Sequence, residues 1–80
     1  MTALRPRVAD ALRAHGIEPA ETDTPESLRE RLNDVYLDEV RRLKGRQVQG
    51  EIALRDYAGH VEALRERFSL LGLPLQHWRE

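Results

Sequence analysis

The fold depends most on residues 41–68, which read RRLKGRQVQGEIALRDYAGHVEALRERF. Gly50 lies near the middle of this stretch, where a glycine can end a helix in the left-handed conformation that other residues avoid. After Gly50, apolar residues recur at steps of three and four, a pattern typical of helices that pack in pairs. The stretch therefore predicts two helices joined by a tight turn. The apolar positions after the turn are Leu54, Tyr57, Val61, Leu64, Phe68 and Leu71.

The helix before the turn is expected at about residues 25–49. Thr24, Pro25 and Glu26 form a typical helix start. They supply an N-cap hydroxyl, a proline for the first turn and an acid near the positive end of the helix dipole. The apolar stripe of this helix consists of Leu28, Leu32, Val35, Tyr36, Val40 and Leu43.

The two stripes match when the helices are paired antiparallel about Gly50. Positions whose numbers sum to about 100 then face each other, and each such pair is apolar on both sides. The helix after the turn is expected at about residues 53–71, and Gly72 and Pro74 end it. The facing pairs are Leu43 with Tyr57, Val40 with Val61, Tyr36 with Leu64, Leu32 with Phe68, and Leu28 with Leu71.

A shorter first helix is expected at about residues 4–15, with Gly16 ending it. Its apolar residues can cover one side of the hairpin, and a short apolar tail follows Pro74. We therefore predict an all-α fold. It is a small three-helix domain that spans residues 1–80, built on a long antiparallel helical hairpin. The apolar positions of the first helix are Leu4, Val8, Ala11 and Leu12.

Composition limits the functions that this chain can perform. A chain of 80 residues without cysteine has no disulfides or thiolate zinc sites, which leaves oligomerisation as the most available source of extra stability. A net charge of −1 argues against bulk electrostatic binding to nucleic acid or to an anionic membrane. No apolar run reaches the roughly 20 residues of a membrane span. We expect a soluble, cytoplasmic protein, since the lack of cysteine fits a reducing compartment.

No residue pattern indicates catalysis, a cofactor or a small-molecule substrate. His15, His60 and His77 lie on three different elements and lack the spacing of zinc ligands. Asp34 and Asp38 lie one helical turn apart, but arginines surround them, which is typical of surface ion pairs. We predict a protein that is not an enzyme and binds no metal.

Glu39 falls within the apolar stripe of the helix before the turn. An unpaired buried carboxylate is unfavourable. Glu39 therefore either pairs with Arg65 or Arg46, or lies at a solvated margin of the stripe. A buried pair would set the register or the choice of partner more than it would stabilise the fold.

Leu37, Val48 and Leu70 lie off the main stripes, and together with Trp78 of the tail they suggest a contact with a partner. We predict a protein–protein interaction or self-association module, with a homodimer favoured. Trp78 is the expected anchor, because tryptophan often dominates the binding energy of interfaces. The predicted contact residues are Leu37, Val48, Leu70 and Trp78.

The alternative is a small nucleic-acid-binding or transcription-associated protein. Basic residues cluster near the end of the helix before the turn, whereas the first half of that helix is acidic. The helix dipole alone favours this arrangement, which would also suit two copies that pair antiparallel. The possible nucleic-acid contacts are Arg41, Arg42, Lys44 and Arg46.

Overall fold

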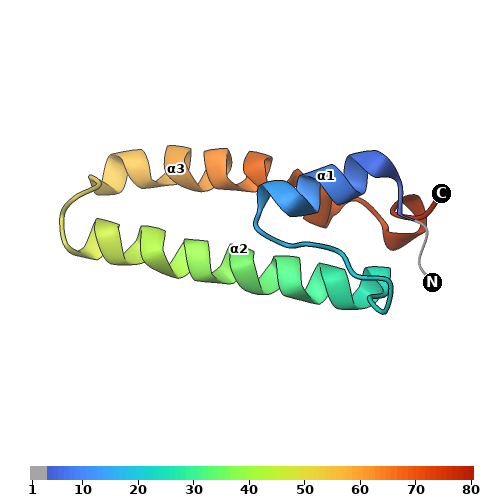
Figure 1. The fold of residues 1–80 in the computed structure, drawn as a ribbon. Coiled ribbons are helices and arrows are strands. Elements are labelled where there is room, and N and C mark those ends of the chain that lie inside the picture. Colours follow the sequence, from blue (N-terminus) through green and yellow to red (C-terminus); the bar gives the residue numbers. More distant parts are fainter. Residues whose placement is uncertain (1–3) are drawn as a thin grey trace.

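The computed structural model describes residues 4–80, and the predicted all-α fold is confirmed there. Helices α2 and α3 lie side by side and antiparallel, while α1 and the C-terminal turns gather at the end away from the connecting turn (Figure 1). The elements are α1 (Pro6–Ala14), α2 (Pro25–Val48), α3 (Leu54–Arg67) and two short 3-10 helices, η1 (Ser69–Gly72) and η2 (Leu75–His77).

Helix α2 begins where the sequence predicts. The Thr24 hydroxyl accepts a hydrogen bond from the Ser27 backbone N–H at 3.1 Å, and the Thr24 N–H donates to the Ser27 hydroxyl at 3.0 Å. These two bonds form a capping box, which satisfies donors that the first helical turn leaves unpaired. Pro25 at the first position has no N–H to satisfy, so the start of the 24-residue helix is well defined.

Glycines end both α1 and α2 with the same backbone geometry. Gly16 and Gly50 have φ angles of 80° and 83°, in the left-handed region that disfavours a Cβ atom. At the end of α2, the Glu51 N–H donates to the Arg46 carbonyl at 2.9 Å and the Gly50 N–H donates to the Gln47 carbonyl at 3.1 Å. This is a Schellman motif, and it reverses the chain into α3.

Two helix boundaries differ from the expected ones. At the N-terminus, Leu4 pairs with Arg79 in an isolated bridge, and the Arg5 N–H donates to the Trp78 carbonyl at 3.0 Å. Contact with the C-terminal tail therefore holds these residues extended, and α1 begins only at Pro6.

The helix predicted at about residues 53–71 is an α-helix only as far as Arg67 and is followed by a 3-10 helix. The His15 ring Nε2 lies 2.8 Å from the Arg67 carbonyl oxygen, and a carbonyl can only accept, so this nitrogen carries the hydrogen. The Leu71 N–H instead donates to the Phe68 carbonyl at 3.0 Å. The α-helix consequently ends at Arg67, and a 3-10 turn follows.

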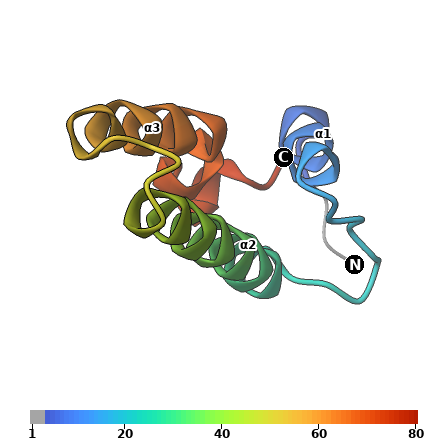
Figure 2. The ribbon, with the colours of Figure 1, turned by 90° about the vertical axis from the view of Figure 1, so that its left-hand side faces the viewer.

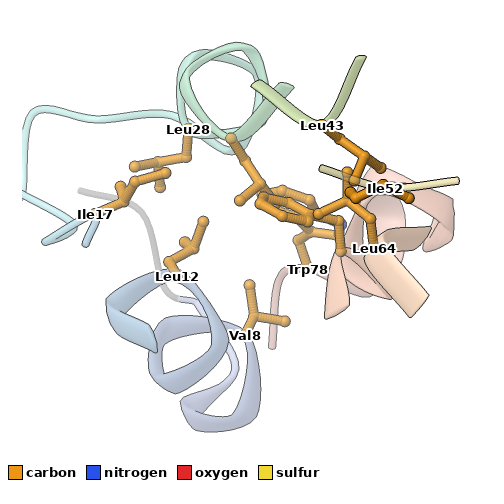
Figure 3. Close-up of a cluster of buried hydrophobic side chains, with 10 residues drawn as sticks. Val8, Leu12, Ile17, Leu28, Leu43, Ile52, Leu64 and Trp78 are labelled. Carbon is orange, nitrogen blue, oxygen red and sulfur yellow. The ribbon is translucent and has the colours of Figure 1, made fainter. Parts of the chain in front are cut away.

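One apolar cluster runs along the seam of the hairpin from Ile52 in the turn to the α1 end, where it joins α1 and the C-terminal tail. Trp78 lies at its centre in Figure 3, fully buried, between Val8 of α1 and side chains of α2 and α3. The indole N–H donates to the Leu73 carbonyl at 3.0 Å, which satisfies the polar atom of this ring. The other buried apolar residues are Leu12, Ile17, Leu28, Leu32, Leu43, Ile52, Leu64 and Phe68.

The molecule is elongated, with extents of 46 × 18 × 16 Å. Figure 2 shows α1 on one side of the hairpin only, so the other side carries no third helix within residues 4–80. Near the turn, no other helix of residues 4–80 covers either side of α2 and α3 (Figure 1). The regions left open by α1 are therefore the surfaces on which a function must be sought.

Candidate functional site

The titratable residues that the sequence singles out take part in ring packing and surface ion pairs. Among residues 4–80, no group of three His, Asp or Glu side chains has the arrangement of metal ligands. His15 stacks on Phe68 with ring centroids 4.0 Å apart, while Asp38 pairs with Arg42 at 2.9 Å. No helix in the described part of the chain has the length and apolarity needed to cross a membrane.

Apolar side chains remain uncovered on the side of the hairpin away from α1. Leu37 is 41% exposed, Val48 is 70% exposed and Leu54 is 71% exposed. Half-buried Val40 and Val61 lie between these residues and the core. We call this surface the open face and define it by Leu37, Val40, Val48, Leu54 and Val61.

Helical spacing places the α2 residues of the open face on one stripe. Leu37, Arg41, Lys44 and Val48 follow each other at steps of four, three and four residues. The Lys44 ammonium lies 5.4 Å from the centre of the Tyr57 ring, which shows that this stripe borders α3. The α2 stripe of the open face therefore carries two positive charges, Arg41 and Lys44, between the apolar residues Leu37 and Val48.

Two of the four predicted contact residues lie elsewhere. Trp78 is fully buried, so the expectation that it anchors a partner is wrong for the folded chain. Its ring fills the space between α1 and the hairpin, a position that the local sequence of the tail does not reveal. Leu70 is half-buried against the core and lies beside Val8 and Ala11 of α1. Leu37 and Val48 are exposed.

The predicted basic cluster divides between two sides of the hairpin. Arg41 and Lys44 lie on the stripe of the open face, whereas Arg42 and Arg46 line a groove between α2 and α3. Arg42 is ion-paired with Asp38 at 2.9 Å, whereas Arg46 contacts Glu51 only at the longer separation of 3.9 Å. The four residues thus form no continuous basic surface.

The groove between α2 and α3 follows the flank of the hairpin on which α1 packs. Its walls carry Arg42 and Arg46 from α2 and His60 and Arg67 from α3, and its volume is about 300 Å³. Buried Leu43 and Leu64, with Ala63, supply the apolar part of its lining. We call this feature the basic groove.

Glu39 also borders the basic groove, at a solvated margin of the apolar stripe. Its side chain is 33% exposed and lies 3.8 Å from Arg42. Arg46 instead pairs with Glu51, and Arg65 pairs with Glu62 at 3.7 Å. The structure therefore shows Glu39 as a partly exposed residue, and neither of its expected partners pairs with it.

Sequence reasoning missed three residues of these surfaces. Leu54 was expected in the seam between the helices, but Ile52 fills the last apolar position against α2 and is 5% exposed. Leu54, as the first residue of α3, points outward instead. His60 and Arg67 join the basic groove from α3, and their spacing of seven residues was the available signal.

Comparison with protein-family models, curated proteins and solved structures found no match to this chain.

Proposed function

We propose that this chain is a non-enzymatic protein–protein interaction module that self-associates through its open face. The observation that carries the proposal is the exposure of Leu37, Val48 and Leu54 on one side of the hairpin. Exposed apolar side chains gathered on one side of a small domain are typical of an interaction site. Pairing two such hairpins would complete a four-helix bundle, in which each open face is covered.

Charge distribution favours a second copy in antiparallel orientation. Residues 41–59, which lie at the turn end in the register about Gly50, contain five basic and two acidic side chains, whereas the rest of the chain contains eight basic and twelve acidic ones. The turn end of the hairpin is thus positive and the α1 end is negative. Two copies that pair antiparallel bring unlike ends together, whereas parallel copies would bring like charges together.

The lack of extra stabilising devices supports the same proposal. A chain of 80 residues without disulfides buries a limited apolar core, and association would add to it. A cytoplasmic location remains a prediction from the cysteine-free composition. The nucleic-acid alternative also remains a prediction, with less support, because Arg42 is ion-paired with Asp38 and the two groove arginines lie apart from Arg41 and Lys44.

Sedimentation equilibrium tests the proposal with two matched variants. Val48→Lys places a charge at the last residue of α2, within the open face, and Ala14→Lys places the same charge at the last residue of α1. A cation is favourable at the C-terminal end of a helix, and both positions lie at such an end, so both variants should fold. We expect a dimer for the wild type and for Ala14→Lys, and at least tenfold weaker association for Val48→Lys.

The salt dependence tests the antiparallel orientation. Added salt should weaken the dimer, because it screens the attraction between unlike ends. A wild-type monomer at high micromolar concentration would overturn the proposed function. A dimer that Val48→Lys leaves intact would show that another surface forms the contact.

A further inference from the structure

The basic groove continues the flank of α2 that α1 covers. Leu28, Leu32 and Val35 follow each other at steps of four and three on the side that packs into the core. The same spacing continues toward the turn with Glu39, Arg42 and Arg46. Since α1 ends at Ala14, nothing within residues 4–80 covers this second half of the flank.

The lining of the basic groove carries more positive than negative charge, with Arg42 paired to Asp38 and Glu39. Three arginines and a histidine line it, against the single acid Glu39. Arg67 and His60 have no ion pair or side-chain hydrogen bond within the described part of the chain. Arg46 contacts Glu51 only at 3.9 Å, a long separation that leaves most of its N–H donors available.

The dimensions of the basic groove fit a small molecule. Its walls run from residue 39 to 46 on α2 and from residue 60 to 67 on α3, and each wall spans about 10 Å at 1.5 Å per residue. The volume of about 300 Å³ lies at the lower end of the range for ligand sites. Buried Leu43 and Leu64 offer an apolar surface beneath the charged walls.

We propose that the basic groove binds a small organic phosphate. The antiparallel helices place Arg46 and Arg67 at opposite ends of the groove, so the phosphate group would lie between their two side chains, each extended toward the middle of the groove. Guanidinium groups bind phosphate oxygens through paired N–H donors. The organic part of the ligand would rest on Leu43 and Leu64. Binding exchanges the long Arg46–Glu51 contact, between two exposed side chains, for charge-assisted hydrogen bonds in a partly enclosed groove.

This site is independent of the proposed self-association. The open face contains Val40 and Val61, whereas the basic groove contains Glu39 and His60, on the opposite side of the seam. Failure of the dimer would therefore leave the phosphate site untouched. Two copies that pair through their open faces would also keep their basic grooves accessible.

An NMR titration of the full chain with phenyl phosphate tests the proposal. We expect saturable backbone shifts concentrated in residues 39–46 and 60–67, and none on addition of phenol at the same concentrations. The double variant Arg46→Ala/Arg67→Ala should bind phenyl phosphate at least tenfold more weakly. The matched control is Arg41→Ala/Arg55→Ala, which removes two exposed arginines outside the groove and should bind as the wild type does.

Two further titrations identify what the groove recognises. Inorganic phosphate should compete with phenyl phosphate, but with lower affinity, since it lacks the apolar part. Sodium chloride at matched ionic strength should reproduce none of the localised shifts. Shifts that do not saturate, or equal weakening by both double variants, would show general attraction of anions to arginine and would overturn the proposal.

Discussion

At the scale of single residues, Trp78 differs most between its sequence context and its place in the structure. It lies two residues before Glu80, among polar neighbours, yet its ring is fully buried. The ring contacts the shared core of α1 and the hairpin (Figure 3). A residue at the end of the chain therefore helps to hold its first helix in place.

Replacement of Trp78 should be strongly destabilising. Trp78→Ala removes a fully buried ring, and such changes cost about 3–5 kcal/mol of unfolding free energy. Trp78→Phe keeps most of the apolar volume but loses the hydrogen bond to the Leu73 carbonyl, so a smaller loss is expected. Urea unfolding followed by circular dichroism measures both. Exposed His77→Ala is the control and should change the free energy by about 0.5 kcal/mol or less; equal effects at both positions would contradict the burial of Trp78.

At the scale of elements, α2 owes its sharp start to local chemistry. Thr24 and Ser27 exchange hydrogen bonds at 3.0 and 3.1 Å, and Pro25 occupies the first helical position. Such bonds act within four residues, so they form in the same way whatever packs around them. This is why the start of α2 follows from sequence, whereas the end of α3, where His15 bonds to the Arg67 carbonyl, does not.

Loss of the cap should weaken α2 by a measurable amount. Thr24→Ala removes the hydroxyl that accepts from the Ser27 N–H, and the expected cost is about 0.5–2 kcal/mol of unfolding free energy. Thr22→Ala, two residues earlier in the loop, is the matched control and should be close to neutral. Thermal unfolding monitored by helical circular dichroism compares the two variants. A Thr24→Ala protein as stable as the control would mean that water replaces the cap without loss.

At the scale of the whole molecule, the two ends of the chain and the start of α2 are joined. The Arg5 guanidinium donates to the Arg79 carbonyl at 2.9 Å, and Arg79 pairs with Glu26 at 3.0 Å. The pKa of the Glu26 carboxyl lies below its ordinary value of 4.5, first because it accepts a hydrogen bond from its own backbone N–H, and then because Arg79 lies nearby. The folded state thus favours the ionised form of Glu26.

The contribution of Glu26 should depend on pH in a definite direction. A lowered pKa in the folded state means that the stabilisation is present above the unfolded pKa and disappears as the pH falls through the folded value. Glu26→Gln should therefore be less stable than the wild type at pH 7, and the difference should shrink on acidification below about pH 4. Urea unfolding at several pH values measures this. Glu30→Gln removes the same charge from α2 without a paired arginine and should show a smaller effect; a difference for Glu26→Gln that grows in acid would contradict the expected sign.

The sequence predicted the hairpin well because its signals are local or periodic. Gly50 requires the left-handed turn, and the apolar repeats of α2 and α3 specify which sides of these helices pack together. The functional surfaces were harder to predict. Leu54 has the spacing of a core residue, but it is 71% exposed because Ile52 reaches the core from the turn. Which of two neighbouring apolar residues becomes buried depends on the path of the backbone between the helices.

By itself, the sequence determined the all-α class, the two long helices and their antiparallel reversal, since caps, glycines and repeats act over short distances along the chain. Only the tertiary structure decided where α1 packs, and with it which side of the hairpin stays open. Burial of Trp78 is a consequence of that packing, whereas Arg42 and Arg46 meet His60 and Arg67 because of the way α2 and α3 pair. They join residues far apart in sequence, and periodicity carries no information on which of several apolar surfaces a short helix will cover.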